Sequence, residues 1–242
     1  VIFVGVGAKG AQRWLQIGGL RFQPSEIMKI VVPLVVAWFL AARPLPPRFS
    51  AVLGALVLLA LPAGLIVIQP DLGTSLLIAA SGLFVLFLAG IGWRYIVGAL
   101  LVAAASAWPV WIYGLKDYQK QRILTMFSPE SDKLGAGWNI IQSKTAIGSG
   151  GWEGKGWLQS TQSRLDFLPE SHTDFIIAVL AEEQGLKGII LLLGLYLLIL
   201  LRGFLIGLRA QTSFGRMMAG SLTLTFFVYI FVNMGMVAGL LP

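Results

Sequence analysis

Six apolar stretches follow one another along the chain, separated by short polar connections and by one long one. Each is close to or above the roughly 20 residues that an α-helix needs to cross a bilayer. A backbone in lipid has to satisfy its own hydrogen bonds, which favours helices over open sheets. The pattern therefore predicts an all-α, polytopic transmembrane helical bundle with about six full spans, at residues 24–42, 51–68, 72–91, 95–115, 175–201 and 217–241.

The composition excludes a water-soluble domain. Of the 242 residues, 57% are hydrophobic and 12% are charged, whereas soluble domains carry about 25% charged residues. The chain has no cysteine and a single histidine, His172, so it contains no disulfide, no catalytic thiol and no multi-histidine metal site. It starts without a methionine and ends within an apolar stretch, which indicates an internal fragment of a longer membrane protein.

The basic residues orient the predicted spans. Three short connections contain six arginines and no acidic residue, so they are expected on the cytoplasmic side. The long segment 116–174 balances seven basic residues with seven acidic ones and is expected outside. Topology thus accounts for most of the net charge of +7, and no nucleic-acid partner is expected. The six arginines are Arg43, Arg48, Arg94, Arg202, Arg209 and Arg216.

One outer segment departs from this charge rule. Near the start of the chain, Lys9, Arg13, Arg21 and Lys29 accompany a single acid, Glu26. A local excess of positive charge on the outer side suggests an anionic ligand there. Contact with lipid headgroups is an alternative that charge alone leaves open.

The long outer segment is the main candidate for function, because a connection of this length is usually functional. Its glycines at 148, 150, 151, 154 and 156 allow close approach of the backbone. Its end is the densest cluster of ionisable groups and leads into the fifth span. Asp174 is expected in the first turn of that helix, where the dipole stabilises an acid by about 0.3–1 kcal/mol. Helix stabilisation and a role as an ionised base both remain open.

Polar residues inside the predicted spans have simpler interpretations. Glu182 and Glu183 follow Asp174 by about 12 Å along the helix, and charges at that depth face protein or water. Lys187 follows Glu183 by four residues, which predicts an ion pair along one helix face. Asn233 in the last span is expected to make an interhelical hydrogen bond.

Several motifs occur in a fixed order across nearly the whole chain. They are Gly10-Ala-Gln-Arg13-Trp14 with Phe22-Gln-Pro-Ser-Glu26, Gln69-Pro-Asp71-Leu-Gly-Thr-Ser75, Tyr118-Gln-Lys-Gln-Arg122, Gly137-Trp-Asn-Ile-Ile-Gln142-Ser-Lys144, Leu168-Pro-Glu170-Ser-His172-Thr-Asp174-Phe175 and Ala181-Glu-Glu-Gln-Gly185. Together they resemble the SEDS family (shape, elongation, division and sporulation), and its rod-shape branch more closely than its division branch. The resemblance implies about ten spans, of which this chain holds the end of the third through the ninth in a single transmembrane domain, with 116–174 as its extracytoplasmic loop.

The resemblance also implies an activity. SEDS proteins are glycosyltransferases that polymerise lipid II into β-1,4-linked peptidoglycan strands and release undecaprenyl diphosphate. They act on the outer face of the bacterial cytoplasmic membrane, in cell elongation and rod shape for this branch. The implied partners are lipid II, the nascent glycan strand, a class B penicillin-binding protein and other elongation-machinery membrane proteins. Asp174 matches the family's proposed catalytic base.

The residues agree with this chemistry. Glycosyl transfer needs a base for the acceptor hydroxyl and positive charge where the diphosphate leaves. Asp174 is the candidate for the first role, and Arg13, Lys144 and Arg122 are candidates for the second. The one cofactor considered is a divalent cation (Mg²⁺ or Mn²⁺), which would share the charge of the diphosphate; the sequence shows no closed metal site. The remaining candidate substrate-binding residues are Glu170, His172, Gln142 and Asp71.

Two other functions compete with this one. A lipid II flippase would need intramembrane charges arranged as a path across the bilayer, and few such residues occur in the middle of the spans other than the fifth. A non-catalytic scaffold for the penicillin-binding protein would tolerate neutral substitutions in the cluster around Asp174.

Overall fold

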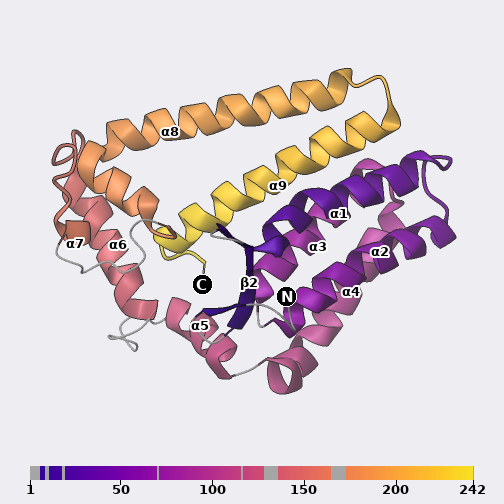
Figure 1. Ribbon diagram of the computed structural model, residues 1–242, viewed down its shortest axis with the longest axis horizontal. Helices are drawn as coiled ribbons and strands as arrows, with labels where there is room; N and C mark the ends of the chain where they lie inside the picture. The colour runs from indigo at the N-terminus through magenta and orange to yellow at the C-terminus, as the bar shows by residue number, and fades with distance from the viewer. Residues whose placement is uncertain are drawn as a thin grey trace. The chain divides into compact units, whose positions relative to one another are not determined.

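The computed structural model describes residues 6–8, 11–17, 20–69, 71–115, 117–127, 136–164 and 173–241 (Figure 1). These residues are mostly helical, which confirms the predicted fold class. Five helices are long and apolar enough to cross a membrane, and a sixth apolar helix has 17 residues. The chain is therefore that of a multi-pass membrane protein.

The predicted spans correspond to observed helices within a few residues at nearly every end. Long apolar runs fix helices well because no other structure satisfies their backbone in lipid. Helix α4 continues into a short π-helix, η1 (Val110–Gly114), and α8 extends eight residues beyond its predicted end at residue 201. The helices are α1 (Pro24–Ala41), α2 (Phe49–Ile68), α3 (Leu72–Leu88), α4 (Trp93–Pro109), α8 (Ile176–Arg209) and α9 (Ser213–Val237).

A small antiparallel sheet precedes α1 and was not predicted. Its strands are β1 (Val6–Ala8), β2 (Ala11–Ile17) and β3 (Leu20–Phe22), in the order β1-β2-β3. Leu15 pairs with Phe22 in the second ladder. Strands of three and seven residues give too short a pattern for alternation to be recognised in the sequence.

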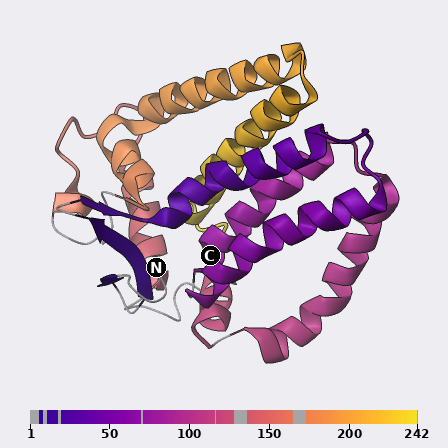
Figure 2. The ribbon, with the colours of Figure 1, turned by 45° about the vertical axis from the view of Figure 1, so that its right-hand side comes forward.

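The chain divides into two compact units, of which the first is Val1–Gly98 with Leu200–Val228. Its core lies among α1, α2 and α3, which run side by side in Figures 1 and 2. Small polar residues tie the helices together: Ser75 Oγ donates to the Ala63 carbonyl at 2.8 Å, and Ser221 Oγ donates to the Ser81 carbonyl at 2.7 Å. The buried core includes Val32, Val36, Leu40, Val52, Ile78, Val85, Leu86 and Met217.

The second unit is Ala99–Ile199 with Tyr229–Pro242. Three helices occupy the described part of the segment that was expected as a long loop: α5 (Asp117–Phe127), α6 (Ala136–Gly150) and α7 (Thr161–Arg164). A buried cluster joins α6, the start of α8 and the end of α9 through Ala146, Phe175, Ala178 and Val237. Ser143 Oγ donates to the Val237 carbonyl at 2.8 Å. This packing positions the start of α8, where the candidate base lies.

Candidate functional site

Asp174 lies two residues before the start of α8, with an exposed side chain. The carbonyl of Phe175 accepts from the amides of Ala178 at 2.9 Å and Val179 at 3.3 Å, so Phe175 caps the helix and Asp174 precedes the cap. The expected position in the first helical turn was therefore wrong by two residues. The reason is the burial of Phe175 against α6 and α9, which fixes where the helix begins.

The end of α9 and the residues after it contact both the segment that holds Asp174 and the side chain of Lys144. Asn233 Nδ2 donates to the backbone carbonyl of Asp174 at 3.3 Å, so the hydrogen bond predicted for Asn233 reaches the turn before α8 and not a helix. Two turns further along, the Lys144 ammonium lies against Gly239, 2.9 Å from the point where a Cβ would be. Gln142 is half-buried on α6, two residues before Lys144. The backbone of Asp174 and the ammonium group of Lys144 thus contact α9 and the residue stretch that follows it, at positions six residues apart.

The remaining predicted site residues are not grouped in this way by the structure. Asp71 belongs to the first unit and caps α3, where its carboxylate accepts from the Thr74 amide at 3.1 Å and from Gln23 Nε2 at 3.5 Å. Such a cap is a structural role. Arg13 and Arg122 lie in β2 and α5, with side chains outside the described part of the chain, and Glu170 and His172 lie outside the described residues.

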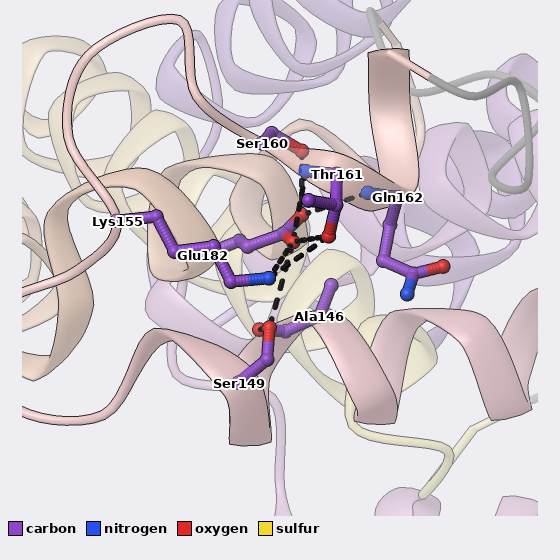
Figure 3. A network of polar contacts seen from close by, with 7 residues as sticks. All are labelled: Ala146, Ser149, Lys155, Ser160, Thr161, Gln162 and Glu182. Carbon is purple, nitrogen blue, oxygen red and sulfur yellow. Dashed lines mark hydrogen bonds and ion pairs between the residues drawn. The ribbon is translucent and has the colours of Figure 1, made fainter.

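Glu182 is the centre of a polar cluster that the sequence did not predict (Figure 3). Its carboxylate is fully buried and pairs with the Lys155 ammonium at 2.6 Å. The Thr161 amide donates to Oε1 at 3.0 Å, and the Gln162 amide donates to Oε2 at 3.3 Å. Hydroxyl groups complete the cluster. These are Ser149 Oγ at 3.5 Å and Thr161 Oγ1 at 2.7 Å from Oε1, and Ser160 Oγ on Oε2.

This cluster holds residues 155–162 against α8. A buried carboxylate is costly unless its oxygens are satisfied, and here donors from four residues of the connecting segment and from Ser149 satisfy them. Sequence spacing gave no sign of the arrangement, because Lys155 and Glu182 are 27 residues apart.

Helix α8 is broken at Gly185, where φ is 64° and ψ is −162°. The glycine-rich segment 150–156 supplies the hydrogen bonds that the break removes. The amides of Lys155 and Gly156 donate to the carbonyls of Glu182 and Glu183, each at 2.9 Å. On the other side of the break, the Leu186 amide donates to the Gly151 carbonyl at 2.9 Å, and the Lys187 amide donates to the Trp152 carbonyl at 3.3 Å.

The break also changes the partner of Lys187. Its ammonium pairs with Glu153 at 2.6 Å instead of with Glu183. The predicted pair was wrong because Gly185 interrupts the helical spacing on which the i,i+4 rule depends. The hydrogen bond and the charge of Lys187 lower the pKa of the exposed Glu153 carboxyl below its ordinary value.

Replacing Gly150 by alanine should destabilise this packing, whereas the same change at Gly148 should not. Both glycines belong to α6, but a Cβ at Gly150 would overlap the Ala181 carbonyl oxygen, while Gly148 has nothing within 4 Å. We expect Gly150→Ala to lower the free energy of unfolding by about 1–3 kcal/mol or more, and Gly148→Ala to leave it unchanged or raise it by about 0.5–1 kcal/mol. Thermal unfolding of both variants in detergent measures the difference. Equal unfolding midpoints would show that α6 does not pack against α8 at Gly150.

The described residues include no group of three or more His, Cys, Asp or Glu side chains placed to hold a metal ion. The cluster around Glu182 is satisfied by donors from the chain itself, so it does not offer free ligand oxygens. The site as described therefore consists of Asp174, Lys144 and Gln142, supported by Asn233 and by the packing at Gly185.

Comparison with proteins of known sequence shows which proteins the chain is similar to. The peptidoglycan glycosyltransferase MrdB of Escherichia coli K12 is 59% identical over 238 residues, which is 98% of this chain and 64% of that protein. A probable peptidoglycan glycosyltransferase FtsW of Trichlorobacter lovleyi is 37% identical over 246 residues, covering 100% of this chain and 64% of that protein. The chain thus spans a little under two thirds of these curated relatives.

Solved structures have the same fold. A chain from the structure described as "Structural coordination of polymerization and crosslinking by a peptidoglycan synthase complex" superposes with a TM-score of 0.83 and 31% identity, over 100% of this chain and 67% of that chain. The rod shape determining protein RodA of Thermus thermophilus superposes with a TM-score of 0.63 and 28% identity, over 97% and 60%. Residues 1–242 match the FtsW/RodA/SpoVE family, described as cell cycle proteins. Because this match covers the entire chain, the chain belongs to the FtsW/RodA/SpoVE family, as its resemblance to the SEDS proteins implied.

Proposed function

We propose that the whole protein polymerises lipid II into β-1,4-linked glycan strands and releases undecaprenyl diphosphate, in cell elongation and rod shape. The observation that carries this proposal is the exposed Asp174 carboxylate before α8, with the Lys144 ammonium beside the same end of α9. Glycosyl transfer from a lipid diphosphate requires a base and a cation, and these two residues supply one of each. The name of the E. coli relative, a peptidoglycan glycosyltransferase, supports the same activity.

In this proposal Asp174 accepts the proton of the acceptor 4-hydroxyl, and the oxygen of that hydroxyl attacks the anomeric carbon of the donor. The bond from that carbon to the diphosphate oxygen breaks, and the configuration inverts from α to β. No enzyme nucleophile takes part. Lys144 stabilises the charge on the leaving diphosphate.

The other candidate residues have binding roles in the proposal. Arg13 and Arg122 contribute further positive charge toward the diphosphate, and a guanidinium suits phosphate oxygens because it donates two parallel hydrogen bonds. We assign Gln142, Glu170 and His172 to the sugars. Asp71 remains a candidate because it belongs to the motif at residues 69–75, although its carboxylate caps α3.

The one cofactor proposed is a divalent cation, for which no protein ligands are assigned. Its charge would be shared with the substrate diphosphate. Polymerisation measured with Mg²⁺, with Mn²⁺ and after chelation would show whether the reaction needs it.

The proposed partner is a class B penicillin-binding protein, with other membrane proteins of the elongation machinery. Support comes from the similar structure of a peptidoglycan synthase complex, whose description joins polymerization with crosslinking. Glycan strands made by this chain would then be substrates for the partner's crosslinking reaction.

We propose the bacterial cytoplasmic membrane as the location, with residues 116–174 and the site on its outer face. Six arginines and no acid in three connections and in the helix ends beside them support this orientation. Because the chain has no cysteine, the single variants Trp157→Cys and Gln211→Cys, both at exposed positions, can be labelled in intact cells. We expect an impermeant maleimide to label position 157 and not position 211. The opposite pattern would reverse the topology.

Synthesis of glycan polymer from purified lipid II by the whole protein tests the proposal directly. A flippase would move lipid II across vesicles without making polymer, and a scaffold would do neither. The structure weakens the flippase interpretation at one point, because Glu182 is enclosed by donors of the chain and lines no path.

A further inference from the structure

A cavity of about 390 Å³ lies between the α1–α2 and α3–α4 connections of the first unit. Its walls are prolines of the first connection, glycines of the second, and the side chains of Arg48, Phe49, Arg94 and Tyr95. The Phe49 and Tyr95 rings stack with centroids 5.9 Å apart. The two connections meet here, and the cavity has the volume of a small ligand site.

The charged groups at this cavity are all positive. Arg48 immediately precedes α2, and Arg94 is the second residue of α4, so each lies at a helix end where free amides add partial positive charge. Arg94 contacts Tyr95, whose hydroxyl accepts from it at 3.5 Å. Within the described part of the chain, Arg48 makes no ion pair with a carboxylate. An anion is therefore the ligand that this cavity favours, and guanidinium groups suit phosphate oxygens.

A third arginine in the same region differs from these two. Arg43 lies 3.6 Å from the centroid of the Phe39 ring and donates to the Phe39 carbonyl. It does not line the cavity. The basic residues of the two connections are therefore not equivalent, as they would be if each served only to orient the spans.

Apolar surface continues from the cavity along two membrane-length helices. Phe49, Leu53 on α2 and Val97 on α4 are exposed by 62%, 52% and 50%. Helices α2 and α4 both begin at the cavity, so it lies at the level where spans meet the membrane surface. A positive cavity beside exposed apolar helix faces matches the two parts of an anionic phospholipid.

We propose that this cavity binds the phosphate of an anionic phospholipid headgroup between Arg48 and Arg94, with the acyl chains along α2 and the first turn of α4. The site is independent of the proposed polymerase activity and of Asp174. It lies at the end of the spans that carries the arginine-rich connections.

Native mass spectrometry of the whole protein titrated with dioleoylphosphatidylglycerol tests the proposal. We expect Arg48→Gln and Arg94→Gln each to weaken binding of one lipid by about fivefold, and the double variant by about 25-fold. Arg43→Gln is the matched control and should change binding by less than about twofold. Because both cavity arginines are exposed, the variants should fold, which an unchanged thermal midpoint verifies.

Four outcomes would overturn the site. If Arg43→Gln weakened binding as much as Arg48→Gln, the lipid would be attracted only by the overall positive charge of the two connections. Dioleoylphosphatidylcholine binding as tightly as the anionic lipid would mean that the acyl chains alone are recognised. Displacement of the lipid by millimolar inorganic phosphate would identify a site for the free anion, and unchanged binding in the double variant would place the lipid elsewhere.

Discussion

Asp174→Asn should abolish polymerisation of lipid II while the protein stays folded. A positioned base contributes about 10²–10⁴-fold to a rate, and asparagine cannot accept the acceptor's proton. The change should not disturb the structure, because Asn233 donates to the backbone carbonyl of Asp174 and not to its side chain. The initial rate of glycan formation by the purified whole protein, with the thermal midpoint measured alongside, gives the answer.

Asp117→Asn is the matched control for this variant. Asp117 is an exposed carboxylate of the same unit, in the first turn of α5, and has no proposed role in the reaction. We expect its polymerisation rate to stay within about twofold of wild type. If the Asp174 variant retained a rate within a few-fold of wild type, the base would have to be another group, and the scaffold and flippase interpretations would gain support.

Glu182→Gln should strongly destabilise the second unit. The substitution keeps the shape of the side chain but replaces one oxygen by an NH₂ donor. Each carboxylate oxygen faces a backbone amide, Thr161 N at Oε1 and Gln162 N at Oε2, so either orientation of the new amide sets two donors against each other. It also leaves the Lys155 ammonium without its anion. Breaking a buried pair in this way costs about 3–5 kcal/mol.

Glu183→Gln separates this effect from a general loss of charge in α8. Glu183 is the next residue and is also buried, but it is not part of the Lys155 cluster. We expect thermal unfolding in detergent to show a markedly lower midpoint for Glu182→Gln than for Glu183→Gln, together with faster proteolysis of residues 151–162. Similar midpoints for the two variants would mean that the cluster contributes little to stability.

The spans were predictable because their signal is local and continuous. A run of about 20 apolar residues has one structural solution in lipid, and the described helices follow it closely. The position of Asp174 close to a helix start was predictable for the same reason. Its exact place before the cap depends on the burial of Phe175 by α6 and α9, which is information from distant parts of the chain.

The packing around Gly185 was not predictable from spacing. The glycines of the outer segment indicated close approach of the backbone, and this is what the structure shows, but nothing in the sequence identifies α8 as the surface approached. Glu182 pairs with Lys155 across 27 residues, and Lys187 pairs with Glu153 across 34. Local rules such as the i,i+4 pair apply only within an unbroken helix.

The break in α8 also determines how the protein fits the thickness of a membrane. A continuous helix of 34 residues would be about 51 Å long, against a hydrocarbon core of about 30 Å, a mismatch that only steep tilt or bilayer deformation could absorb. After the break at Gly185, residues 186–209 extend about 36 Å and can match the core with moderate tilt. The match to the bilayer core then depends on residues 186–209, and Asp174 and Glu182 both precede that stretch of the helix.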